Sequence, residues 1–194
     1  MGSPARTALF GGTFDPIHNA HLEIARAAAD RFDLAKILFV PAANPPHKPG
    51  GVSAPYEDRV RMAELACGVD PRFEVSRLEE GASRSYTILT IERLLALGVR
   101  PLGFLIGADA FREIRTWHRW SDIVASVEFI VVTRPGANWD TPPGAVVHEL
   151  TGLHLPISSS DARRKITDGA SDVPVPEPVL EYIRERGLYR SQQK

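Results

Sequence analysis

The sequence has very little cysteine and no excess of charge of either sign. Cys67 is the only cysteine among 194 residues, which excludes an internal disulfide and a cysteine-rich zinc site. Its surroundings, VRMAELACGV, predict a thiol packed on the apolar face of a helix. There are 23 lysines and arginines against 24 aspartates and glutamates, so the formal net charge is −1. Without a global field that attracts nucleic acid or anionic membranes, any anion site has to be built locally.

Long apolar segments are also missing. No run approaches the roughly 20 apolar residues of a membrane span. The opening residues, MGSPARTALF, lack the apolar stretch of a secretory signal. These absences predict a cytoplasmic protein without membrane or nucleic-acid partners; a homo-oligomer is left open. The length suits one domain with a substantial core, and we expect residues 1–194 to form it.

Short apolar runs alternate with segments of helical spacing. The runs that predict strands are Thr7–Phe10, Lys36–Val40, Arg72–Ser76, Leu102–Ile106 and Glu128–Thr133. Apolar residues share one face of three predicted helices: Leu22, Ala25, Ala29 and Phe32; Val60, Met62, Ala63, Ala66 and Cys67; and Ile88, Ile91, Leu94, Leu95 and Leu97, which Gly98 ends. The alternation predicts an α/β fold, a doubly wound, mostly parallel sheet flanked by helices. Ligands of such sheets bind at the carboxyl edge of the strands.

The stretch GGTFDPIHNAHL, residues 11–22, follows the first predicted strand, and we expect a helix to begin just after its glycines. Gly11 and Gly12 allow close approach of a ligand to the backbone, and the start of a helix favours an anion. His18 and His21 lie three residues apart in the expected first helical turn, so both imidazoles can reach one phosphate. In the alternative interpretations one histidine caps the helix while the other packs, or the pair binds zinc. However, the glutamate of H-E-x-x-H and nearby thiolates are missing.

The same stretch resembles the signature of nucleotidyltransferases that carry an H-x-G-H motif. Further stretches resemble motifs of bacterial nicotinate-mononucleotide adenylyltransferases, in order: NPPHK (44–48), GADAFREIRTWHRW (107–120), TRPG (133–136) and ISSSDAR (157–163). The match runs from Gly11 to Tyr189. The departures are small: Ala20 replaces the usual glycine and Ser160 the usual threonine. Leu89 takes the place of a more common aspartate, and we assign no role to it.

The resemblance implies a Rossmann-like nucleotidyltransferase fold and transfer of AMP from ATP to nicotinate mononucleotide, with Mg²⁺ on the triphosphate. It implies catalytic roles for His18, His21, Lys48 and Arg163. The residues it implies for ATP are Gly11, Gly12, Thr13, Phe14, Gly107, Asp109, Ile157, Ser158, Ser159 and Ser160. Those it implies for the mononucleotide are Asn44, His47, Tyr86, Thr87, Trp117 and Arg134.

This chemistry needs little more than positioning and charge stabilisation. The attacking phosphate oxygen is already ionised near neutral pH, so the absence of an evident nucleophile–base pair is consistent with the reaction. Simpler structural interpretations remain for several residues. Ser158 or Ser159 could be a plain helix cap, as could Thr87, and Arg163 could belong to a solvated basic face. Trp117 or Trp120 could simply pack under the loop, and for Trp120 we favour this interpretation; we assign no role to His148 and His154.

Three other functions compete with this one. A phosphopantetheine adenylyltransferase shares the histidine motif but does not usually combine PPHK, the tryptophan after GADAFREIRT and TRPG. A preference for the amide form of the mononucleotide depends on donors that the sequence does not reveal. A non-catalytic nucleotide-binding protein of the same fold could lose some of the charged residues that are intact here.

Overall fold

The computed structural model describes residues 6–45, 52–100, 102–133, 138–153 and 156–190. The strands are β1 (Arg6–Gly12), β2 (Leu34–Pro41), β3 (Phe73–Val75), β4 (Leu102–Gly107), β5 (Glu128–Val132) and β6 (Val146–Leu150). The helices are α1 (Asn19–Phe32), α2 (Tyr56–Cys67), α3 (Thr87–Ala96), α4 (Ala108–Arg112), the 3-10 helix η1 (Ile114–Thr116), α5 (Trp120–Ser126), α6 (Ser159–Thr167) and α7 (Glu177–Arg186). None of the helices in these ranges is long and apolar enough to cross a bilayer.

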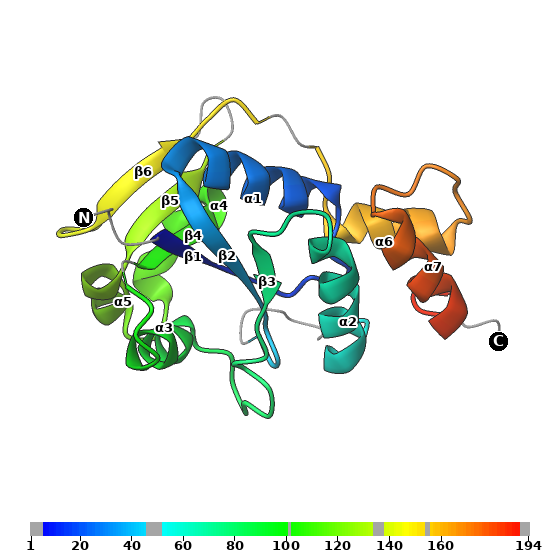
Figure 1. Ribbon diagram of the computed structural model, residues 1–194, viewed down its shortest axis with the longest axis horizontal. Helices are drawn as coiled ribbons and strands as arrows, with labels where there is room; N and C mark the ends of the chain where they lie inside the picture. Colours follow the sequence, from blue (N-terminus) through cyan, green and yellow to red (C-terminus); the bar gives the residue numbers. More distant parts are fainter. Residues whose placement is uncertain (1–5, 46–51, 101, 134–137, 154–155, 191–194) are drawn as a thin grey trace.

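The strands form one sheet in the order β3-β2-β1-β4-β5-β6, and every pairing is parallel (Figure 1). The predicted doubly wound sheet is therefore confirmed. The strand order reverses between β1 and β4, where Leu9 is in register with Phe104. In sheets of this kind the crevice for a ligand opens at such a reversal, outside the carboxyl ends of the strands.

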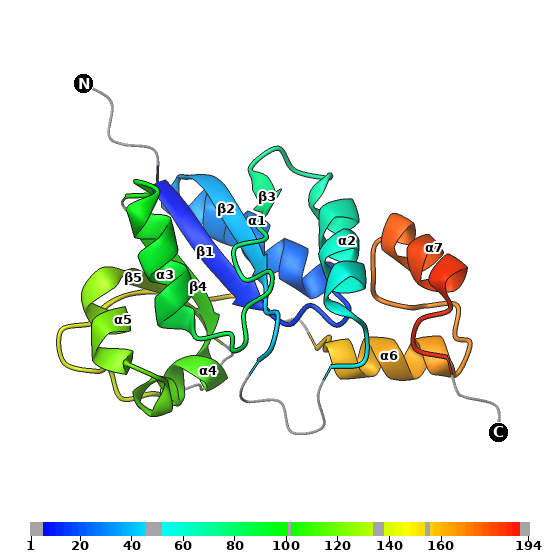
Figure 2. The same cartoon turned by 90° about the horizontal axis from the view of Figure 1, so that it is seen from below.

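Helices cover both faces of the sheet, which explains why the strands are nearly continuous in apolar residues (Figures 1 and 2). Ala8 and Phe10 of β1 belong to a buried cluster with side chains of α1, α2 and α7. Leu9, between them, belongs to a second cluster with side chains of α3, α4 and α5. The alternation along β1 thus assigns its neighbouring side chains to opposite layers of the core.

The predicted elements match the observed ones with a few corrections. Strand β6 was not predicted, because this edge strand is short, carries His148 and Glu149 in its middle and has only Leu150 fully buried. The prediction for Leu97 is wrong: α3 ends at Ala96, and Leu97 is 70% exposed. Gly98 does terminate this helix, with a positive φ of 81°. Cys67 is a buried free thiol, as predicted, and burial raises its pKa to about 12.

Candidate active site

The two histidines of the opening motif lie against each other at the start of α1. His18 is the N-cap residue, and the His21 ring stacks on it with centroids 3.7 Å apart and 24° between the planes. The backbone N–H of His18 donates to Nδ1 of His21 at 3.2 Å, so a neutral His21 carries its ring proton on Nε2. His18 is 5% exposed, and burial lowers its pKa to about 4. His18 is therefore a neutral imidazole near pH 7.

This geometry combines the structural and functional interpretations of the histidines. His21 does cap the helix, and His18 is buried, as the structural alternative predicted. The two rings are nevertheless adjacent, as a shared phosphate requires. The described residues contain no group of three or more histidine, cysteine or acidic side chains that could hold a metal ion, which gives the zinc alternative no support there.

The prediction for the glycines needs correction. Gly11 and Gly12 lie inside β1, paired with Val40 and Pro41, and the helix begins only at Asn19. A Cβ on Gly12 would lie 2.8 Å from two ring carbons of Phe14, so Gly12 makes room for that ring. A Cβ on Gly11 would meet no atom within 4 Å. Both glycines line the pocket described below, and their predicted approach to a ligand stays a prediction.

Residues 13–18 bridge the strand and the helix through an unusual backbone. Phe14 has a φ of 50°, and the Asp15–Pro16 peptide bond is cis. The Phe14 ring is buried against Phe10, Phe39 and His21. The side chain of Phe14 therefore belongs to the core. Its predicted contact with ATP can involve the backbone only.

The late motif begins α6 and meets the opening motif directly. Ser159 Oγ donates to the carbonyl of Pro16 at 3.0 Å, across 143 residues of sequence. Arg163 Nη1 donates to the carbonyl of Asp15 at 2.6 Å, and Nη2 to Ser160 Oγ at 3.2 Å. The two motifs that the resemblance assigned to one nucleotide thus share one site.

The structure decides between the simpler structural interpretations of this motif, a helix cap for Ser158 or Ser159 and a solvated face for Arg163. Ser158 is the N-cap of α6, because its Oγ accepts from the N–H of Asp161 at 3.1 Å. The Arg163 side chain is 26% exposed and turned toward the opening motif, so it does not belong to a solvated face. Arg164 does, since it is 67% exposed and pairs with Asp161. Ile157 precedes the helix and is half-buried.

A buried guanidinium supports the loops around this site. Arg59 of α2 is fully buried and donates to three backbone carbonyls, of Thr13 at 2.6 Å, Ala54 at 3.2 Å and Ala43 at 3.4 Å. Burial lowers its pKa from the ordinary value, against the nearby charge of Asp15. Arg59 therefore adds a second, buried positive charge near the site, beside that of Arg163.

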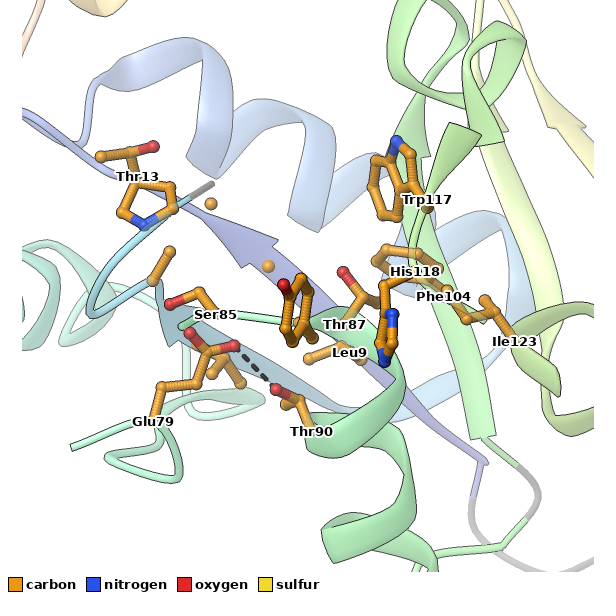
Figure 3. A pocket seen from close by; sticks show the side chains of 16 residues that line it. Leu9, Thr13, Glu79, Ser85, Thr87, Thr90, Phe104, Trp117, His118 and Ile123 are labelled. Atoms are coloured by element: carbon orange, nitrogen blue, oxygen red, sulfur yellow. Dashed lines mark hydrogen bonds between the residues drawn. The ribbon is translucent and has the colours of Figure 1, made fainter. Parts of the chain in front are cut away.

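A pocket of about 240 Å³ opens at the carboxyl edge of β1, β2 and β4 (Figure 3). Gly11, Gly12 and Thr13 of the opening motif line it, whereas His18, His21 and Arg163 do not. Trp117 lies on one side of it and Thr13 on another. Tyr86 also lines it, with its ring 4.4 Å from that of His118. Tyr86, not Thr87, is the N-cap of α3, and Thr87 makes no side-chain cap bond, which corrects the capping alternative.

One acidic side chain faces this pocket. Glu79 is 8% exposed; its Oε1 accepts from Thr90 Oγ1 at 2.7 Å and its Oε2 from the N–H of Ala43 at 3.3 Å. Asn44 lies next to Ala43 and joins this loop to the start of α3, because its Nδ2 donates to the carbonyl of Ser83 and its N–H to Ser85 Oγ. Asn44 does not line the pocket, and its predicted contact with the mononucleotide stays a prediction.

Some predicted residues are not brought to this pocket. Gly107 and Asp109 lie at the start of α4 outside its lining, with the Asp109 side chain 83% exposed and 3.5 Å from Arg112. His47, Lys48 and Arg134 lie outside the described residues, as does His154. Trp120 begins α5 and packs on the second core cluster, as we favoured.

Sequence reasoning missed several members of the site. Asp15 was read only as part of a turn, and Glu79 and His118 carried no motif of their own. Arg59 did give a signal, because it shares a helix face with Met62, Ala63 and Ala66, where an arginine is unexpected. Tyr189 was noted only as the end of the match, yet its hydroxyl donates to Asp15 Oδ1 at 2.8 Å.

Comparisons with known proteins agree with this geometry. The cytidylyltransferase-like family profile matches residues 9–165. A protein of Solibacter usitatus named "Probable nicotinate-nucleotide adenylyltransferase" is 55% identical over 187 residues, covering 95% of this chain and 99% of the relative. A protein of the same name from Acidothermus cellulolyticus is 39% identical, covering 97% of this chain and 96% of the relative.

A solved structure shows the same fold at lower identity. The nicotinic acid mononucleotide adenylyltransferase of Plasmodium falciparum, in complex with NaAD, superposes with a TM-score of 0.80 and 20% identity over 95% of this chain and 97% of that one. The full-length match to the bacterial proteins settles the family. This chain belongs to the nicotinate-nucleotide adenylyltransferases, within the cytidylyltransferase-like family.

Proposed function

We propose that this protein transfers the adenylyl group of MgATP to nicotinate mononucleotide at the carboxyl edge of its sheet, releasing pyrophosphate and nicotinate adenine dinucleotide. One observation carries the proposal. The start of α6 and Arg163 bind the backbone of the stretch that carries the stacked pair His18–His21, and Gly11–Thr13 of the same stretch line an aromatic pocket, although the two motifs lie more than a hundred residues apart. Phosphate donors and an aromatic platform at one edge suit a reaction between two nucleotides.

The side of the site that we assign to ATP has hydrogen-bond donors for the negative charge that develops in the transition state. An oxygen of the mononucleotide phosphate attacks the α-phosphorus, and the bond to the β-phosphate bridging oxygen breaks. We assign His18 and His21 to the phosphates at the reacting centre; His18 donates as a neutral imidazole, and His21 through Nε2. The N-terminus of α6 and Arg163 face the leaving pyrophosphate. Such preorganised donors stabilise charge where it appears in the transition state.

Mg²⁺ fits this site as part of the substrate. The described residues do not gather three metal-ligating side chains, which suits an ion held mainly by phosphate oxygens and water. When bound, it neutralises part of the triphosphate charge. Lys48, by resemblance, adds a cation from the protein.

The acceptor side is aromatic. The indole of Trp117 can stack on an electron-poor pyridinium ring, and Tyr86 and Thr87 line the same pocket. This lining favours a ring-bearing acceptor over the flexible chain of phosphopantetheine. By resemblance, His47 and Arg134 also face the mononucleotide. Because α7 packs into the same core cluster as β1, we further propose that residues 1–194 act as one domain.

Pyrophosphate release tests the proposal. Purified protein with MgATP is offered nicotinate mononucleotide, its amide analogue or phosphopantetheine in parallel. We expect turnover with the nicotinate form. Turnover with phosphopantetheine alone, or none with any acceptor, would contradict it, and the amide arm measures selectivity.

A pair of histidine variants tests the assigned site. His21→Ala should retain its circular dichroism spectrum and lose nearly all turnover. His148→Ala provides the matched control, because His148 lies on edge strand β6 and pairs with Glu128 outside the site. Equal activity of the two variants would show that the role of His21 is wrong.

A further inference from the structure

The C-terminal segment reaches back into the active site through one hydroxyl group. Tyr189 lies three residues after α7, and its OH donates to Asp15 Oδ1 at 2.8 Å. Its carbonyl accepts from Thr167 Oγ1, at the end of α6, at 2.8 Å. Tyr189 has a φ of 60°, a conformation that non-glycine residues rarely adopt and that the surrounding contacts must hold in place.

Asp15 is the centre of these contacts. Its side chain is only 2% exposed. Besides the Tyr189 hydroxyl, the N–H groups of Ser53 and Ala54 donate to its two oxygens at 2.7 and 3.0 Å. Oδ2 lies 3.8 Å from Arg163 Nη1, while the same nitrogen donates to the Asp15 carbonyl at 2.6 Å. Neutral donors thus satisfy the Asp15 carboxylate, and the distance from its Oδ2 to Arg163 Nη1 is longer than a hydrogen bond.

This balance has a consequence for Arg163. A buried carboxylate that loses a donor needs another, because an unsatisfied charged group is costly in a buried place. Arg59 is held by three backbone carbonyls, whereas Arg163 already has a side-chain nitrogen 3.8 Å from the carboxylate. Without the Tyr189 hydroxyl, Asp15 would draw the guanidinium into a close ion pair. The guanidinium would then pair with Asp15 and would no longer be available to bind the phosphates.

We propose that Tyr189 is a positioning residue that acts through Asp15 to keep the Arg163 guanidinium available to the phosphates of ATP. The inference rests on the proposed function, since it takes Arg163 as a phosphate ligand. It extends the active site to a segment that carries no nucleotide-binding motif. Tyr189 touches no reacting atom, so its effect should fall on the ATP side of the kinetics.

The test compares two tyrosine variants that each lose one hydrogen bond to an aspartate. Tyr189→Phe removes the bond to Asp15. Tyr182→Phe removes the 2.7 Å bond from Tyr182 of α7 to Asp58 of α2, which lies outside the pocket. We expect similar small losses of thermal stability. Tyr189→Phe alone should lower kcat/KM for MgATP about tenfold, the usual effect of one charge-assisted hydrogen bond, with KM for nicotinate mononucleotide unchanged.

A double-mutant cycle shows whether the effect passes through Arg163. In an Arg163→Ala background, Tyr189→Phe should cost no further activity, because the group it positions is already gone. An undiminished loss in that background would overturn the proposal. So would full activity of Tyr189→Phe, or an equal loss in Tyr182→Phe, which would indicate a merely structural role.

Failure of the proposed function is distinguishable from failure of this inference. If the wild-type protein releases no pyrophosphate with MgATP and nicotinate mononucleotide, the function itself is wrong. If the wild type is active and Tyr189→Phe matches it, only the role of Tyr189 is wrong.

Discussion

At the scale of single residues, burial decides the charge of His18. Its pKa falls from 6.5 to about 4 because the ring is buried at the start of a helix. Between these values the unfolded chain binds more protons than the folded one, so stability is present above pH 6.5 and is lost as the pH falls toward 4. The slope contributed by this one group is at most about 1.4 kcal/mol per pH unit.

The variant His18→Gln should remove that slope. We expect the wild type to lose roughly 2 kcal/mol more than the variant when urea unfolding is compared at pH 7 and pH 4.5. All other titrating groups are shared, so the difference between the two proteins isolates His18. Parallel pH profiles would mean that the imidazole is not buried in its neutral form.

The two glycines of β1 make a second contrast at this scale. An alanine at position 12 would press its Cβ against the Phe14 ring at 2.8 Å, whereas at position 11 it would enter open space on the pocket wall. Gly12→Ala should cost about 1–3 kcal/mol in urea unfolding, the range for an overpacked core. Gly11→Ala should stay within about 0.5 kcal/mol and raise KM for the substrates instead. The prediction fails if both variants lose the same stability.

At the scale of elements, Arg59 connects α2 to the loops that carry the site. Its three carbonyl acceptors come from residues 13, 43 and 54, which lie on separate segments. Arg59→Met would leave these buried carbonyls without their donor. We expect a loss of about 3 kcal/mol or more in urea unfolding, since each unsatisfied buried group costs about 1–3 kcal/mol.

A second arginine of α2 serves as the control for this prediction. Arg61 is 52% exposed and pairs with Glu64 at 3.3 Å, three residues along the helix. Arg61→Met should change stability by no more than about 0.5 kcal/mol, as exposed pairs usually do. A loss as large as that of Arg59→Met would mean that removal of any arginine from α2 has the same effect.

The elements also show what the sequence could and could not predict. The strands β2, β4 and β5 were evident because buried parallel strands are continuously apolar. Edge strand β6 lacked that signal, since Leu150 is its one fully buried residue. The late motif was found, but its contact with Pro16 depends on tertiary packing that no local pattern encodes. Asp15 and Tyr189 form a pair across 174 residues, and each carries only a weak signal alone.

At the scale of the whole molecule, the strand order reverses between β1 and β4, and the carboxyl edge of the sheet has two sides there. We assign one side to ATP and the other to the mononucleotide. The parallel sheet brings the ends of β1, β2 and β4 together, so the turn after β1 meets α6 on one side and the aromatic pocket on the other. A net charge near zero means that the anions are attracted by local groups rather than by the field of the whole protein. We therefore expect a substitution on one side of the edge to impair the use of one substrate and to leave the other largely unaffected.

Kinetic constants for the two substrates measure that separation. Trp117→Ala should raise KM for nicotinate mononucleotide about tenfold through lost stacking and leave KM for MgATP within about twofold. Arg163→Ala should instead lower kcat by about 10²–10³, because it removes a charged donor from the transition state. Trp120→Ala is the matched control, since Trp120 packs on the same core cluster as Trp117 without lining the pocket. If Trp117→Ala impaired both substrates equally, or Trp120→Ala reproduced its effect, the tryptophan would support the fold rather than the acceptor. The division of the edge into two half-sites would then be wrong.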